Sequence, residues 1–124
     1  MTFFLHYPKN KNDRTAFFRR YGLNGIYSGK HWSARRKDAE DWHMFVISEL
    51  KRQEIPKKCF SDPVKISFYW ADNLDIDNHA LMGKMTVDAL KGYLLENDSK
   101  RYFSEVCHKY WDGKCIKIEI EKSE

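Results

Sequence analysis

Residues 64–70 alternate between apolar side chains and other residues, and this run restricts the fold more than any other part of the chain. In the segment VKISFYW, one face of an extended backbone would carry Val64, Ile66, Phe68 and Trp70. A period of two is typical of a strand that is buried on one side. We therefore expect residues 64–70 to form a strand that packs against a hydrophobic core.

Two other segments have the spacing of amphipathic helices. Residues 33–53 repeat apolar side chains at helical intervals, and Ser33 is the expected N-cap. A second helix is predicted over residues 78–92, with Asp77 or Asn78 as its N-cap. Each helix has one apolar stripe, so each should cover part of the same core.

Short strands are expected near both ends of the chain. Residues 2–7 are rich in aromatic side chains and predict a first strand. Residues 106–111 and 115–121 flank Asp112-Gly113, and this dipeptide is a strong hairpin signal. The sequence therefore predicts an α+β fold in which a small mixed β-sheet is packed by two main helices.

The composition fits one domain over residues 1–124, with 42% hydrophobic residues available for a core. Three cysteines without CxxC spacing are expected to be reduced thiols. The apolar runs are too short to span a bilayer, so we expect a cytoplasmic protein with no membrane partner.

The N-terminal third is strongly basic, although the whole chain has a net charge of only +4. Residues 8–37 contain nine lysines and arginines against the single acid Asp13, and residues 8–32 are predicted to form a long loop or arm. Lysine and arginine can bind phosphates, and interleaved aromatic side chains can stack on unpaired bases. A solvated surface or aromatics that pack on the core would explain the same pattern. The candidate nucleic-acid-binding residues are Arg19, Arg20, Lys30, Arg35, Arg36 and Lys37.

Acidic residues gather around one lysine directly after the strand of residues 64–70. Asp75 and Asp77 are two residues apart, which places both carboxylates on one side of an extended chain. Lys84 falls on the same face of the following helix, and Asp88 can pair with it at i, i+4. Asp98 can fold back from the turn after that helix. By contrast, Asp72 is interpreted as a surface residue.

Carboxylate oxygens with this spacing suit Mg²⁺, and Mn²⁺ is possible. The predicted metal ligands are Asp75, Asp77 and Asp98, and Lys84 would add a positive charge at a phosphate. Such a group could hydrolyse nucleic acid. Aspartate and asparagine are also common in turns and caps, so the spacing alone leaves both interpretations open.

Two groups of residues give the chain a likeness to a known family. One runs Leu74-Asp75-Ile76-Asp77-Asn78, then Lys84, Asp88-Ala89-Leu90 and Leu95-Glu96-Asn97-Asp98. The other is the upstream segment Asn24-Gly-Ile-Tyr27-Ser-Gly-Lys30-His31-Trp32-Ser-Ala-Arg35-Arg36. Together they resemble the RusA family of Holliday junction resolvases, in its phage-type branch. The resemblance extends from about Tyr7 to Ile120.

The resemblance implies a homodimeric, Mg²⁺-dependent endonuclease that makes paired symmetric nicks across four-way DNA junctions during recombination and repair. The family's catalytic aspartates correspond to Asp75, Asp77 and Asp98, and its lysine corresponds to Lys84. Lys84 follows Asp77 by about one helical turn more than in the best-known members. The four residues are therefore the expected catalytic group.

Two other functions remain open at this stage. The chain could be a non-catalytic module that binds DNA junctions and has a structural acidic cluster. It could also be a metal-dependent nuclease that acts on RNA or on simple flaps. Both alternatives share the basic surface and differ in what the aspartates do.

Overall fold

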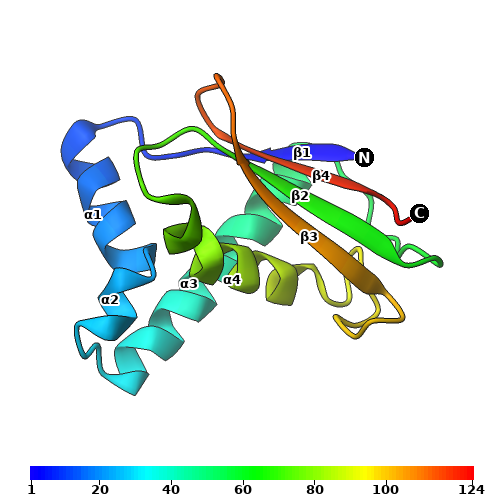
Figure 1. Cartoon of the computed structure of the whole chain (residues 1–124), viewed down its shortest axis with the longest axis horizontal. Helices are drawn as coiled ribbons and strands as arrows, with labels where there is room; N and C mark the ends of the chain where they lie inside the picture. The colour runs from blue at the N-terminus through cyan, green and yellow to red at the C-terminus, as the bar shows by residue number, and fades with distance from the viewer.

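The chain combines four strands with four α-helices, and Figure 1 shows their arrangement in the computed structural model, which describes residues 1–124. Their order is β1 (Thr2–Leu5), α1 (Lys11–Tyr21), α2 (Asn24–Tyr27), α3 (Trp32–Arg52), β2 (Val64–Trp70), the 3₁₀ turn η1 (Ile76–His79), α4 (Ala80–Leu90), β3 (Phe103–Tyr110) and β4 (Ile116–Lys122). The predicted α+β class is confirmed, and β2 has the expected bounds.

The four strands form one mixed sheet in the order β1-β4-β2-β3. β2 is parallel to β3 and antiparallel to β4, and β1 is antiparallel to β4. In the register of β2 and β4, Ile66 lies opposite Ile120 and Phe68 lies opposite Ile118. All four of these side chains are fully buried, and β4 and β2 are the two central strands of the sheet.

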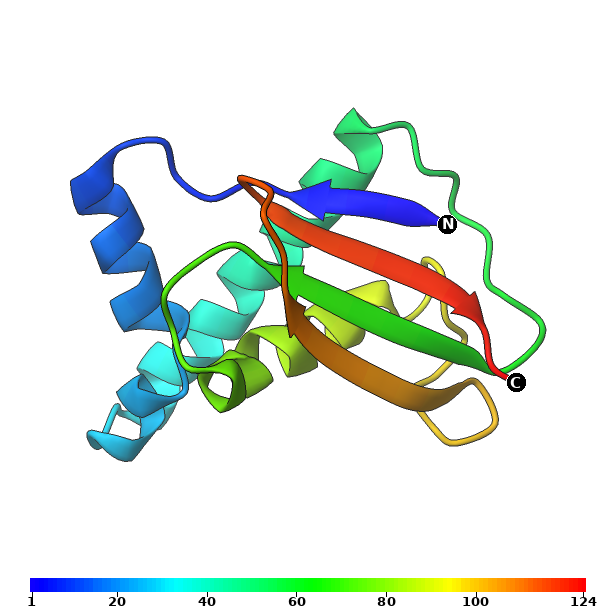
Figure 2. The ribbon, with the colours of Figure 1, turned by 45° about the horizontal axis from the view of Figure 1, so that its top comes forward.

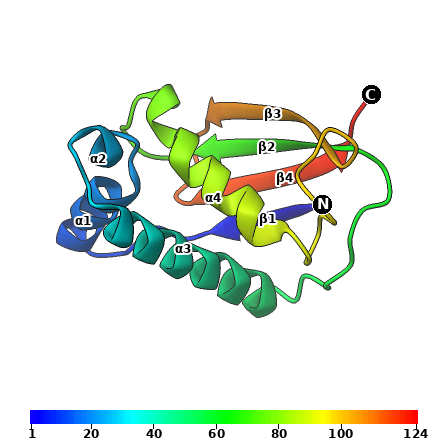
Figure 3. The same ribbon diagram turned by 90° about the horizontal axis from the view of Figure 1, so that it is seen from below.

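Helices α3 and α4 cover the same face of the sheet, as Figure 3 shows. Between the helices and the strands lie Trp42, Leu50, Met82 and Leu90, all fully inaccessible to solvent. Burial of such side chains contributes about 1.5–3 kcal/mol each, which makes this layer the main source of stability. No helix combines the length and the apolar composition that a membrane crossing requires.

The predicted hairpin across Asp112-Gly113 is wrong, because β2 lies between β3 and β4 (Figure 2). The connection instead crosses the end of β2, where the Trp111 amide donates to the Trp70 carbonyl at 3.1 Å. β3 is exposed along much of its length, whereas β4 buries three isoleucines. Pairing β4 with the apolar β2 therefore buries more surface than pairing it with β3.

Residues 8–32 are largely helical and do not form the predicted loop or arm. The polar residues that suggested a loop lie at the helix ends. Asn10 caps α1 by accepting hydrogen bonds from the amides of Asn12 and Asp13, and Gly22 ends it. Helix caps and loops favour the same residue types, so composition alone did not separate them.

Helices α3 and α4 both begin at other residues than predicted. His31 caps α3, because its Nδ1 accepts a hydrogen bond from the Ser33 amide at 3.2 Å, and the predicted cap Ser33 is inside the helix. The second helix begins with the tight turn η1 and continues as α4 from Ala80. The 3₁₀ turn takes up the residues that were predicted as the helix start.

Candidate metal and nucleic-acid site

The turn between β2 and α4 presents Asp75 and Asp77 to solvent. Both residues are exposed, and neither carboxylate has a hydrogen bond or an ion pair with the rest of the chain. The turn is held from two sides, because the Asp75 carbonyl accepts from the Asn78 amide and the Tyr110 hydroxyl donates to the Leu74 carbonyl. Two free carboxylates therefore stand on a fixed backbone.

The hydroxyl of Tyr110, at the end of β3, is affected by the charges of the acidic side chains. Partial burial and the negative charges of three aspartates raise the pKa of its hydroxyl. Those aspartates are Asp72, Asp75 and Asp77. The end of β3 thus lies within the electrostatic field of the predicted ligands.

Asp72 is not a surface residue, and the interpretation of it as one is wrong. Its side chain is 1% exposed, and its Oδ1 lies 2.7 Å from Nε2 of the fully buried His79. The Tyr7 hydroxyl donates to its Oδ2 at 2.7 Å. Trp70 stacks on the His79 ring with 4.3 Å between ring centroids. A charge this deeply buried requires such partners, so Asp72 fixes the turn that carries Asp75.

The other predicted members of the site lie on α4 and in the segment that follows it. Lys84 Nζ is 2.9 Å from Asp88, which confirms the predicted i, i+4 pair. Asp98 lies 3.9 Å from Lys84 and only 2.9 Å from Lys91, a residue that the sequence analysis did not single out. The hydrogen bond from Lys91 is the main cause that lowers the pKa of Asp98.

The predicted ligands are only partly brought together. Asp75 and Asp77 share one turn, whereas Asp98 is occupied by lysines at the other end of α4. No group of three histidine, cysteine, aspartate or glutamate side chains is arranged to hold a metal ion. The three aspartates as placed do not form a metal site, and a metal that bound all of them would have to take Asp98 from Lys91.

A groove of about 340 Å³ runs along α4 beside β3. Lys84 and Asp98 line it, together with His108 of β3. Gly83 permits this close packing, since a Cβ at that position would lie 2.9 Å from the His108 ring. Burial lowers the pKa of His108, which accepts a hydrogen bond from Trp70 Nε1 at 3.0 Å. The groove is therefore bordered by Lys84 on the helix and by an imidazole on the strand.

The predicted basic residues fall into two classes. Arg20 and Lys30 both bind the buried Asp38, and the hydrogen bond to Asp38 is the main cause that raises the pKa of Arg20. Arg36 pairs with Glu40, and Lys37 pairs with Asp41. The exposed Arg19 and Arg35 have no carboxylate partner. Arg20 thus joins α1 to α3, and Lys30 joins the segment after α2 to α3.

The basic segment contacts the acidic turn directly. The Asn24 amide donates to Asn78 Oδ1 at 3.1 Å, and the Leu23 amide donates to the Asn78 carbonyl at 3.2 Å. Lys30 and Arg35 also line a cavity of about 200 Å³ that Lys84 borders from α4. Residues from the two groups quoted above, far apart in sequence, thus form one continuous surface.

The aromatic residues of the basic segment also separate into two classes. Phe17, Phe18 and Tyr21 pack against Tyr7 or Trp42 and belong to the core. Tyr27 and Trp32 remain 79% and 62% exposed. Only these two are free to stack on a base.

No protein-family model matches the chain, and no curated protein matches it either.

Proposed function

We propose that this chain is a RusA-like, Mg²⁺-dependent endonuclease that acts as a homodimer on four-way DNA junctions in the cytoplasm. One observation carries the proposal: Asn78 of the segment Asp75-Ile-Asp77-Asn78 binds the backbone of Asn24, which begins the upstream basic segment. The ordered motifs of the resemblance therefore meet on one surface. A chance likeness of two separate segments gives no reason for such a contact.

The carboxylates of Asp75 and Asp77 are available for a ligand because nothing in the chain neutralises them. A bound Mg²⁺ would supply an activated water and neutralise charge on a phosphodiester. Lys84 Nζ lies 2.9 Å from Asp88, and the Lys84 side chain also lines the groove beside β3. In this proposal Lys84 binds a phosphate next to the cut, and Asp98 completes the acidic group after leaving Lys91.

Arg19 and Arg35 offer unpaired charges for DNA phosphates. In this proposal Arg36 and Lys37 add further phosphate contacts, since their ion pairs are exposed and cost little to break. Arg20 and Lys30 help indirectly, by holding α1 and α2 against α3 through Asp38. Because a four-way junction has two-fold symmetry, a C₂ dimer would present two cutting sites at a fixed spacing.

The decisive experiment is cleavage of a synthetic four-way junction over a titration of Mg²⁺. The native chain should give paired symmetric nicks, and Asp75→Asn should abolish them without loss of junction binding. Asp62→Asn is the matched control, because Asp62 is an exposed aspartate that pairs only with Lys122. Equal cutting by Asp75→Asn and Asp62→Asn would refute the assignment, as would absence of cutting by the folded native protein.

A second candidate is a junction-binding module without catalysis. The observation that favours it is the pairing of Asp88 and Asp98 with lysines, which gives these acids a structural role. This module would bind junctions equally well in EDTA and would tolerate Asp98→Asn. Competition with RNA and flap substrates in the same assay separates the remaining nuclease alternatives.

A further inference from the structure

A cleft of about 610 Å³ opens where β1 ends, beyond the groove and the cavity already described. Its lining comes from four parts of the chain: the segment after β1, helix α1, the last turns of α3 and the loop between β3 and β4. Apart from Tyr7 and Pro8, its lining residues are histidine, acidic or basic side chains. Four of its residues are cations, namely Lys9, Arg14, Arg52 and Lys114.

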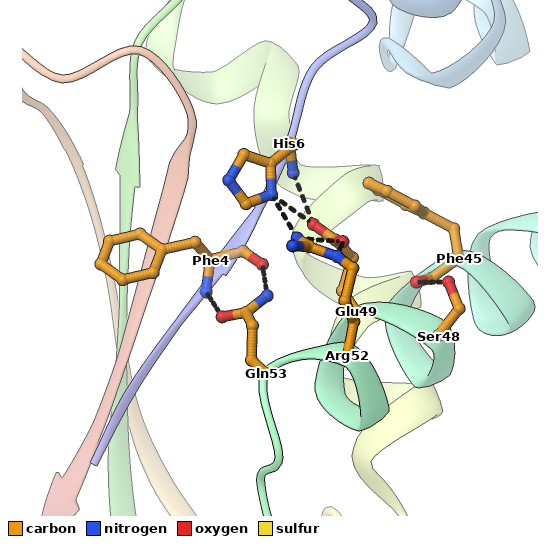
Figure 4. Close-up of polar contacts among 7 residues, drawn as sticks. All are labelled: Phe4, His6, Phe45, Ser48, Glu49, Arg52 and Gln53. Atoms are coloured by element: carbon orange, nitrogen blue, oxygen red, sulfur yellow. Dashed lines mark hydrogen bonds and ion pairs between the residues drawn. The ribbon is translucent and has the colours of Figure 1, made fainter.

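One wall of the cleft is a rigid hydrogen-bonded unit, shown in Figure 4. Glu49 is 7% exposed and accepts from the His6 amide at 3.0 Å, while Arg52 donates to its other oxygen at 2.6 Å. Gln53 holds the backbone of Phe4 through hydrogen bonds of 2.9 and 2.6 Å. Glu49 is therefore fully engaged and its charge is matched by Arg52.

The other three cations of the cleft have no carboxylate within ion-pair distance. Arg14 lies only over the ring of Tyr7, with 5.8 Å to the ring centroid. Lys9, Arg14 and Lys114 come from positions far apart in sequence, and the fold brings their like charges to one cleft. Like charges repel, and an anion bound between them would remove that repulsion.

The cleft continues toward the acidic turn. A second cavity, of about 360 Å³, is lined by Lys11, Arg14 and Leu74 among others. Arg14 borders both cavities, and Leu74 immediately precedes Asp75. A chain of cations therefore leads from Lys114 past Arg14 and Lys11 to the free carboxylates of the turn.

We propose that this cleft binds the backbone phosphates of a nucleic-acid strand whose neighbouring nucleotides reach the turn of Asp75 and Asp77. The inference rests on the proposed function and adds a second phosphate-binding region to the one at the start of α3. An extended polyanion fits better than a single small anion, because the cations are spread along two connected cavities. Lys9, Arg14 and Lys114 are also unpaired, unlike Arg20 and Lys30.

The test measures junction binding in EDTA, so that cleavage cannot contribute. The variant is Lys9→Ala/Lys114→Ala, and the control is Lys58→Ala/Lys100→Ala, which removes the same charge from loops at the opposite end of the sheet. The cleft variant should weaken binding on the order of tenfold at low salt, and its log K against log[salt] slope should become shallower by about 2. The control should change both quantities much less.

Equal binding by the cleft variant and the control would overturn the inference. Lys9→Arg/Lys114→Arg should restore binding, and loss of binding in this variant too would assign the effect to a damaged fold. Competition with inorganic phosphate separates the sources of the anion: displacement of DNA from the native chain by millimolar phosphate alone would indicate a small-anion site and refute a strand. Cleavage is scored separately. Cleft-dependent binding without cutting would refute the proposed function alone, and cutting without cleft dependence would refute this inference alone.

Discussion

The turn before α4 and the region around the end of α4 contain the same residue type in opposite electrostatic states. Asp75 and Asp77 have no cation near them, whereas Asp88 and Asp98 share Lys84 and Lys91 at distances of 2.9 to 3.9 Å. The free pair stands on a turn that the buried Asp72 and His79 hold in place. The spacing in the sequence does not distinguish these aspartates from one another. Their ion-pair partners in the structure show which of them are available to a ligand.

The largest expected effect tests the anchor of the free pair. Asp72→Ala leaves His79 buried without its carboxylate, so the free energy of unfolding should fall by about 3–5 kcal/mol. Asp75→Ala removes an exposed group without partners and should stay within about 0.5 kcal/mol of the native protein. Urea denaturation measures both. If the two variants lost similar amounts of unfolding free energy, Asp72 would not be a structural anchor distinct from the proposed ligand Asp75.

Low pH should destabilise the protein through the same residue, Asp72. Burial alone would raise the pKa of Asp72, but hydrogen bonds from His79 and Tyr7 outweigh it and lower that pKa. The stabilisation from ionised Asp72 is complete above its unfolded pKa of about 3.9, and it is lost as the pH falls through the lower folded value.

Thermal melts between pH 7 and pH 2.5 measure this loss. The Tm of the native protein should be constant near neutral pH and fall steeply in acid. The Tm of Asp72→Asn should fall less over the acid range. Parallel acid curves for the two proteins would show that other carboxylates control the transition.

A smaller effect concerns the paired acids. Lys91→Ala removes the main partner of Asp98 and should let it turn toward other ligands. If Asp98 joins Asp75 and Asp77, Mn²⁺ binding measured by calorimetry should tighten by a few-fold at low salt. Asp98→Asn in the Lys91→Ala background should cancel that gain. Unchanged Mn²⁺ affinity in Lys91→Ala would show that Asp98 does not bind metal together with Asp75 and Asp77.

The smallest expected signal is spectroscopic and tests whether DNA lies on the side of the free pair. Trp32 is exposed near the segment that contacts Asn78, whereas Trp42 and Trp70 are fully buried. DNA that stacks on Trp32 should quench a modest part of the fluorescence excited at 295 nm. Trp32→Phe should remove this quenching without loss of salt-sensitive binding. Unchanged quenching in Trp32→Phe would place the contact elsewhere.

Several parts of the fold and the site could be predicted from the sequence because their signals are local. The alternation of residues 64–70 predicted β2, and the helical spacing of residues 33–53 predicted α3 to within one or two residues. The pair of Lys84 and Asp88 follows from the helix repeat and is present. The prediction of a hairpin across Asp112-Gly113 was wrong, because a turn signal does not show whether the two flanking strands pair with each other or with a third strand between them.

The sequence by itself determined the strand β2, the helix α3 and the positions of the acidic and basic segments, since these follow from patterns over a few residues, but it did not reveal α1 and α2. Only the tertiary structure decided that Asp72 is buried against Tyr7 and His79, that Asp98 pairs with Lys91, and that Lys9, Arg14 and Lys114 converge. These arrangements bring together residues up to about a hundred positions apart. They depend on the balance between apolar burial and conformational entropy for the whole chain, and a short segment of sequence does not specify that balance.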